Sequence, residues 1–155
     1  ALPISPDEPI FERLMIQQSL ASGLWMGIVG YGLFYFLHQQ QGMGEFEARN
    51  LLLLLMVLFE NIHALNCRSE RRSIFQIPLS ANWLLIGAVV LAQGIHIAAL
   101  YIPGLNGVLE VAPVSPQRWL YLLGLALSLA LVVEMLKLFR RRRGSGRTAD
   151  GSGSA

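Results

Sequence analysis

The residues of this sequence that are best suited to chemistry lie in one stretch, and they begin with Glu60. Glu60, His63 and Cys67 follow one another at spacings of three and four residues, so a helix places all three on one face. A carboxylate, an imidazole and a thiol are all transition-metal ligands. The spacing also allows a local hydrogen bond between Glu60 and His63. The pattern therefore leaves two interpretations open, a metal site and a structural hydrogen bond.

Glu60 and His63 also form an E-x-x-H pair, the motif of helical di-iron proteins. Those proteins use two such pairs and two further glutamates facing the bundle core. The other carboxylate deep in an apolar run is Glu134, and Lys137 stands where a second histidine would be needed. The di-iron interpretation is therefore disfavoured. We expect Glu134 and Lys137 to form an ion pair, with Lys137 extending its ammonium group toward the membrane interface. His96 is expected to be a hydrogen-bonded packing residue rather than a ligand.

Composition indicates that these polar groups belong to a membrane protein. Of 155 residues, 54% are hydrophobic and only 14% are charged, whereas soluble proteins carry about 25% charged residues. The apolar residues form four runs long enough to span most of a bilayer. We predict an all-α fold, a membrane four-helix bundle whose transmembrane helices cover about residues 14–37, 50–66, 82–102 and 117–139. A carboxylate in such a helix costs about 2.5–3.5 kcal/mol, and such groups usually face the bundle interior or water.

The ends and loops predict the orientation. Residues 1–13 read as a cytoplasmic linker and residues 140–155 as a basic, disordered cytoplasmic tail. Ten Lys or Arg residues lie in residues 1–13, in the loop at 67–80 and in the stretch from Lys137 onward, against two in the other loops. Positive charge marks the cytoplasmic side, so we predict a multi-pass integral membrane protein with cytoplasmic N- and C-termini. The run Arg140–Arg143 is then a topology anchor and not a nucleic-acid site.

Small residues predict where another helix can approach. Ser19, Gly23 and Gly27 recur every four residues in the first run, which leaves a stripe without bulky side chains on one helix face.

The single cysteine, Cys67, excludes an intrachain disulfide. The chain starts at Ala1 without an initiator methionine, and we expect it to be a fragment of a longer protein.

Several stretches resemble a known transporter family in the correct order. Residues 59–66 (FENIHALN) and 67–76 (CRSERRSIFQ) are similar to the eighth transmembrane helix and following loop of type II P-type cation-transporting ATPases. Residues 82–87 and 94–101 resemble the ninth helix of that family. Residues 117–120 and 134–141 resemble the start and end of the tenth. The resemblance covers residues 8–143, the seventh to tenth helices, and is closest to the calcium-pump branch.

This resemblance implies a role for Glu60. In the calcium-pump branch a glutamate shortly before Ala-Leu-Asn is an ion ligand, and Glu60 matches it. His63, a second candidate, falls where the calcium pump has asparagine and the sodium pump has an acid. The family couples transport to a phosphorylated aspartate in a DKTGT motif, and this sequence does not contain that motif. The resemblance thus implies a transported cation, with calcium a candidate, and restricts ATP and magnesium to the parent pump.

Two functions remain open from the sequence. In the first, the chain is the C-terminal membrane support domain of an ATP-driven cation transporter, which braces the ion-translocating core and lends one carboxylate to an ion site. Its partners are then the lipid bilayer, the remaining transmembrane helices and the cytoplasmic domains of the pump. In the second, the chain is a stand-alone small membrane protein that acts by helix packing with a partner, without transport catalysis. In neither case is ATP hydrolysis expected from this chain alone.

Overall fold

The computed structural model describes residues 8–67 and 83–149, with side chains over 13–67 and 83–142, and every regular element in these residues is a helix. The elements are α1 (Glu8–Tyr35), the π-helical turn η1 (Phe36–Gln40), α2 (Glu45–Asn66), α3 (Trp83–Tyr101), the short α4 (Leu105–Val108) and α5 (Pro116–Ala149). Four helices are long and apolar enough to cross a membrane. The predicted all-α fold with four membrane helices is confirmed. The basic residues at 68–72 and the connector at 73–81 lie outside the described residues.

Two helices begin earlier than the sequence predicts. α1 starts at Glu8, within the predicted linker, because Pro9 is compatible with the first turn of a helix. α2 starts at Glu45, five residues before the predicted span. Glu45 and Glu47 lie in its first turn, where negative charge interacts favourably with the positive end of the helix.

At the other end, α5 continues through the predicted tail to Ala149. The structure thus has helix over residues 140–149, where the sequence predicts a disordered tail. The run Arg140–Arg143 extends α5 directly, and arginine is one of the better helix formers.

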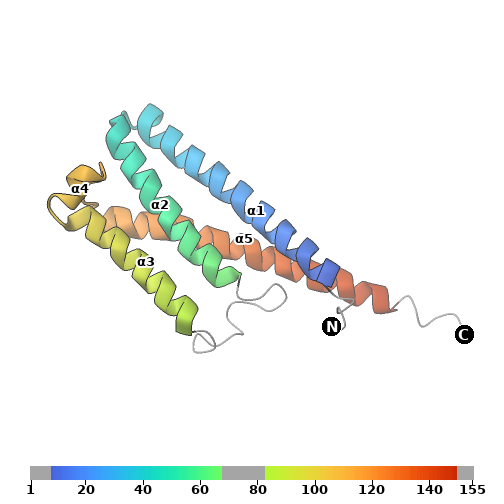
Figure 1. Ribbon diagram of the computed structural model, residues 1–155. Coiled ribbons are helices and arrows are strands. Elements are labelled where there is room, and N and C mark those ends of the chain that lie inside the picture. The colour runs from blue at the N-terminus through green and yellow to red at the C-terminus, as the bar shows by residue number, and fades with distance from the viewer. Residues whose placement is uncertain (1–7, 68–82, 150–155) are drawn as a thin grey trace, which may run out of the picture.

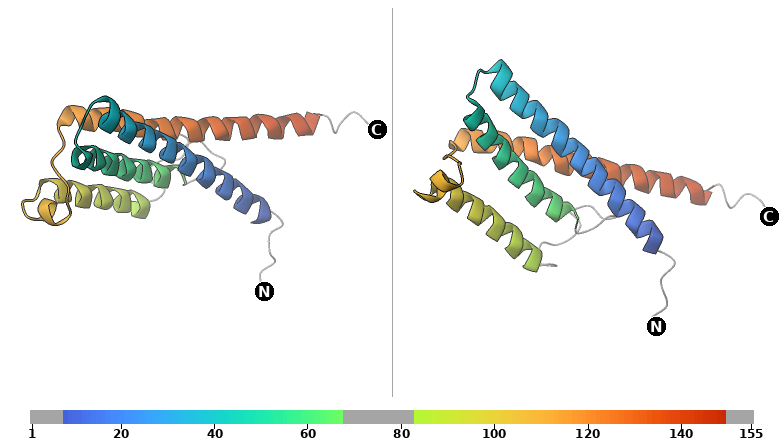
Figure 2. Two further views of the ribbon diagram at one scale, coloured as in Figure 1. Left: turned by 90° about the horizontal axis from the view of Figure 1, so that it is seen from above. Right: turned by 45° about the horizontal axis from the view of Figure 1, so that its top comes forward.

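α2 occupies the centre of the bundle. It lies between α1 and α3 and packs against α5, which crosses the other helices (Figures 1 and 2). The first turn of α1, the last turn of α2, the first turn of α3 and the last turns of α5 lie at one end of the molecule (Figure 1). The two ends of the described chain are therefore on the same side, as four membrane crossings require.

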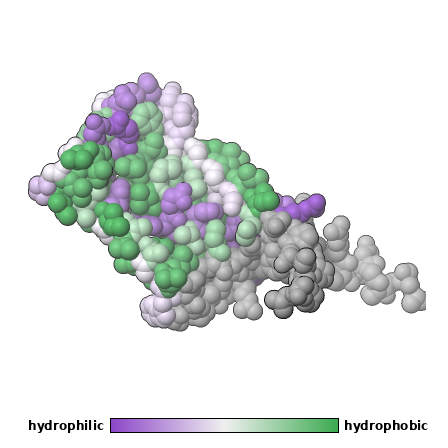
Figure 3. Space-filling view, viewed as in Figure 1, coloured by the Kyte–Doolittle hydropathy of each residue, from purple (hydrophilic) through white to green (hydrophobic). Residues whose placement is uncertain are grey.

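The core lies where α2 meets α5. Its fully buried residues share an apolar side chain and a helical spacing: Leu54, Leu55 and Phe59 on α2, and Leu122, Ala126, Leu129 and Val133 on α5. Large apolar side chains also cover the outside, among them Leu20, Leu84, Leu120 and Leu131, each more than 60% exposed. Figure 3 shows this hydrophobic exterior, with hydrophilic residues gathered at the turn between α1 and α2 and across the middle of the visible face. An apolar exterior of this extent fits a bilayer rather than water.

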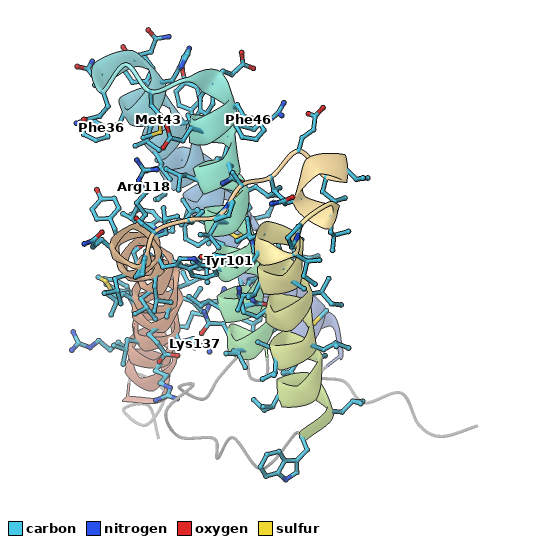
Figure 4. The ribbon with its side chains drawn as sticks, turned by 90° about the vertical axis from the view of Figure 1, so that its left-hand side faces the viewer. Phe36, Met43, Phe46, Tyr101, Arg118 and Lys137 are labelled. Carbon is cyan, nitrogen blue, oxygen red and sulfur yellow. The ribbon has the colours of Figure 1, made fainter. Side chains whose placement is uncertain are left out.

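The loop after α3 is fixed to the start of α2. The side chain of Asn50 donates to the carbonyl oxygen of Ala112 at 2.8 Å and accepts from the backbone N–H of Ala112 at 3.1 Å. The hydroxyl of Tyr101 donates to the carbonyl oxygen of Val114 at 2.6 Å. Two exposed ion pairs join the same segments, Arg49–Glu110 and Arg118–Glu47. This end of the bundle, where Tyr101 and Arg118 are labelled in Figure 4, is held by polar contacts that span the α2–α3–α5 junction.

α1 packs closely against α2 at Gly30. A Cβ atom at Gly30 would lie 2.3 Å from Cε of Met56 and 3.2 Å from Cδ1 of Leu52. Gly23 and Gly27, in contrast, are exposed and have no neighbouring atom within 4 Å of a built Cβ. The predicted stripe of Ser19, Gly23 and Gly27 therefore faces outward, away from the described helices. Whether another helix packs on it stays a prediction.

We predict that Gly30→Leu destabilises the membrane-inserted protein by about 1–3 kcal/mol, because the added side chain overpacks the α1–α2 contact. The measurement is the free energy of unfolding in detergent micelles, followed by circular dichroism. Gly27→Leu is the matched control on the same helix, and we expect little loss there. Equal losses for the two variants would contradict the close approach at Gly30.

Candidate cation site

Glu60 lies on α2, six residues before the end of the helix, and its side chain is exposed on the surface of the bundle. It is nevertheless inside the candidate membrane span Glu45–Asn66. Among the side chains that the structure describes, none forms a hydrogen bond or an ion pair with Glu60. The carboxylate is thus presented at membrane depth on a face that this bundle does not cover.

His63 lies one turn further along α2 and is half-buried. Its Nε2 atom is 3.6 Å from Sγ of Cys67. Its Nδ1 atom is buried, with no hydrogen-bond partner in the described part of the chain. The hydrogen bond that the spacing of Glu60 and His63 allows is not formed in the structure, where Nε2 of the imidazole contacts Sγ of Cys67 instead.

The structure does not assemble the transition-metal site that the spacing of Glu60, His63 and Cys67 allows. Within residues 8–67 and 83–149, no three His, Cys, Asp or Glu side chains gather closely enough to hold a metal ion. Glu134, the carboxylate considered for a di-iron centre, lies 3.4 Å from Nζ of Lys137. This contact confirms the predicted ion pair between Glu134 and Lys137.

A second polar contact joins α2 to α3 beside Glu60. The amide of Asn61 donates to Oε1 of Gln93 at 2.8 Å. Nε2 of Gln93 and Nε2 of His96 are buried without a hydrogen-bond partner among the described residues. The prediction that His96 is a hydrogen-bonded packing residue is thus not met at Nε2. The contact between Asn61 and Gln93 was not anticipated, although two amides in facing apolar helices are a recognisable signal for an interhelical hydrogen bond.

A third polar group, which we call the end cluster, comprises Gln18, Asn66, Glu134 and Lys137. Nζ of Lys137 and Nε2 of Gln18 each lie 3.4 Å from the backbone carbonyl oxygen of Asn66. The side chain of Lys137 is only 2% exposed. The prediction that Lys137 extends toward the interface is therefore wrong, because the ammonium group is directed between α1, α2 and α5. The signal in the sequence was the four-residue spacing of Gln18 and Ser22, two polar residues on one face of an otherwise apolar helix.

Glu60 and His63 supply only part of the ligands that a bound cation needs. A carboxylate contributes one or two oxygen atoms, whereas a hard cation such as Ca²⁺ takes six to eight oxygen ligands. His63 lies nearby, but its nitrogen atoms suit transition metals better than calcium. A cation at Glu60 would therefore need most of its ligands from outside the described residues.

Comparison with known proteins agrees with this geometry. Residues 2–139 match the family described as "Cation transporting ATPase, C-terminus". The chain is 30% identical over 143 residues to the probable cation-transporting ATPase F of Mycobacterium tuberculosis, a match that covers 91% of this chain and 16% of that protein. The same values hold for the protein of the same name from Mycobacterium bovis. The chain is also 25% identical over 171 residues to the endoplasmic reticulum calcium ATPase srcA of Aspergillus fumigatus, covering 90% of this chain and 18% of that protein.

The chain thus spans about one sixth of the length of these relatives. The family match extends over all four candidate membrane helices, and the helices have the number and order that the resemblance requires. This chain belongs to the C-terminal membrane region of the P-type cation-transporting ATPases.

Proposed function

We propose that this membrane domain braces the ion-translocating core of an ATP-driven cation pump and lends it one carboxylate, that of Glu60. The observation that carries the proposal is the position of Glu60, which is exposed from its own bundle inside a membrane span. A charged group at the centre of a membrane helix costs about 2.5–3.5 kcal/mol unless it meets protein, an ion or water. The helices of the parent pump outside this chain are the natural source of that environment.

The nature of the cation follows from the ligand type. Carboxylate oxygen is a preferred ligand of hard cations such as Ca²⁺, and srcA is named a calcium ATPase. Calcium is therefore a candidate for the transported ion, with Glu60 as one ligand and other oxygen atoms supplied by the rest of the pump. ATP and magnesium act elsewhere in the parent protein, because the sequence of this chain contains no DKTGT motif.

The bracing role rests on the polar contacts that hold α2 from both ends. Asn50 fixes the start of the helix to the loop at Ala112. Asn61, five residues before the end of α2, binds Gln93 near the middle of α3, and the end cluster holds the last residue of α2. Ligands carried on a rigid scaffold stay closer to productive geometry than ligands on loops. α2 therefore presents Glu60 from a fixed support.

We predict that Glu60→Gln in the full-length pump lowers the apparent cation affinity by about 1–3 kcal/mol, the range for a contact with a charged group. Expression and folding should stay close to wild type, since glutamine keeps the size of the side chain. The measurement is cation-dependent phosphoenzyme formation, titrated against each candidate ion. Glu45→Gln, an exposed glutamate in the first turn of the same helix, is the matched control. Unchanged affinity for every ion would show that Glu60 is structural.

We also propose that the end of the bundle at Cys67 and the first turn of α1 faces the cytoplasm, since ten of the twelve basic residues belong to this side. Cys67 is exposed and is the one cysteine of the chain. We predict that membrane-impermeant thiol reagents label it in inverted vesicles or opened cells and leave it unlabelled in intact cells. Cys67→Ser controls for labelling elsewhere. Labelling from outside intact cells would reverse the orientation.

A further inference from the structure

Lys137 is a buried cation inside a membrane bundle. Its side chain is 2% exposed, and its Nζ atom lies 3.4 Å from Oε1 of Glu134 on the same helix and 3.4 Å from the carbonyl oxygen of Asn66 on α2. Figure 4 labels Lys137 on the side of α5 that is turned toward α2. A lysine used only as an interface anchor would extend its ammonium group into water. The position of Lys137 therefore calls for a role inside the bundle.

The carbonyl group of Asn66 has an unusual need for a partner. Asn66 is the last residue of α2, and the last four carbonyl groups of a helix have no partner within the helix. These carbonyls carry the negative end of the helix dipole, which is stabilised by a nearby cation. Asn66 is also only 1% exposed, so its carbonyl oxygen must find its partner within the protein.

Two side chains from two different helices converge on this carbonyl. Lys137 reaches it from α5, and Nε2 of Gln18 reaches it from α1, each at 3.4 Å. Both distances exceed those of typical hydrogen bonds, so the attraction between the ammonium group and the negative helix end is mainly electrostatic. The backbone N–H of Cys67 completes the helix end by donating to the carbonyl oxygen of His63 at 2.9 Å.

The polar groups around Lys137 make the contact at the carbonyl of Asn66 sensitive to the loss of the lysine charge. Oε1 of Gln18, Oγ of Ser22 and both side-chain polar atoms of Asn66 are buried without a hydrogen-bond partner among the described residues. The hydroxyl of Ser22 and the side-chain amide of Asn66 are neutral donors, so neither can replace the positive charge of Lys137.

We propose that Lys137 is a positioning residue, which caps the C-terminal end of α2 and thereby fixes the height of Glu60 in the membrane. Six residues separate Asn66 from Glu60, about 9 Å along a helix axis. A helix end that frays or shifts moves the carboxylate with it. The cap is a property of this chain alone, whereas its effect on cation affinity rests on the proposed function.

The first test measures the helix end directly. Amide hydrogen exchange of residues 60–67 is followed in the full-length pump, reconstituted in lipid nanodiscs. We expect exchange about tenfold faster in Lys137→Met, since local opening of the last turn is favoured when the cation at the helix end is lost. Lys137→Arg should restore slow exchange. Arg142→Met, which removes an exposed cation from the same helix, should leave it unchanged.

The second test reads the consequence for ion binding. The cation concentration for half-maximal phosphoenzyme formation should rise severalfold in Lys137→Met and return toward wild type in Lys137→Arg. If Lys137→Met fails to reach the membrane, Gln18→Leu removes the other donor to the same carbonyl, and we expect a smaller increase in both readouts.

The outcomes separate the two parts of the inference. Unchanged exchange in both Lys137→Met and Gln18→Leu would overturn the cap. Faster exchange with unchanged cation affinity, in a pump where Glu60→Gln does shift affinity, would overturn the positioning role. If Glu60→Gln shifts no affinity, the proposed function fails and the positioning role fails with it, while the exchange data still decide whether Lys137 caps α2.

Discussion

The structure depends on the polar contacts that join α2 to each of its neighbouring helices. Backbone polar groups and buried side chains in a bilayer must find their partners within protein, and only helices and closed barrels achieve this for the backbone. α2 carries Asn50, Asn61 and Asn66 along one membrane span. Asn50 binds the loop before α5, Asn61 binds α3, and the carbonyl of Asn66 is met by side chains of α1 and α5. Each neighbour of α2 is thus bound to it by polar contact as well as by apolar packing.

These contacts explain why α2 lies at the centre although it is not the most hydrophobic helix. Apolar packing alone specifies membrane helix pairs weakly, because lipid tails are as apolar as leucine side chains. Interhelical polar contacts are more specific, since each one pairs a residue with a single partner at a fixed position along the helix axis. The pair Asn61–Gln93 fixes α3 near mid-helix, while the end cluster fixes α1 and α5 near the last turn. Together they determine the axial position of all four membrane helices.

The sequence predicts the helices better than it predicts their polar partners. Long apolar runs reveal four spans because hydropathy is local, and the spacing of Glu134 and Lys137 reveals their ion pair for the same reason. The burial of Lys137 was missed, because a lysine near the end of a span reads equally well as an interface anchor. The spacing of Glu60 and His63 leaves a local hydrogen bond open, and in the structure Nε2 of His63 contacts Sγ of Cys67 instead. Partners such as Gln93 for Asn61 lie 32 residues apart in the chain, and only the assembled bundle brings them together.

The exterior of the bundle combines apolar surfaces with the exposed carboxylate of Glu60. The outer sides of α3 and α5 present large apolar side chains that are more than half exposed, such as Leu84, Val90, Leu120 and Leu131, and these surfaces are compatible with lipid. The exposed carboxylate of Glu60 is not, since its cost of about 2.5–3.5 kcal/mol is a large fraction of the 5–15 kcal/mol by which proteins are typically stable. The chain spans about one sixth of the length of its relatives, and in the function that we propose the rest of the pump covers the face of Glu60. An apolar exterior interrupted by the exposed carboxylate of Glu60 inside a candidate span is the surface expected of the proposed support domain.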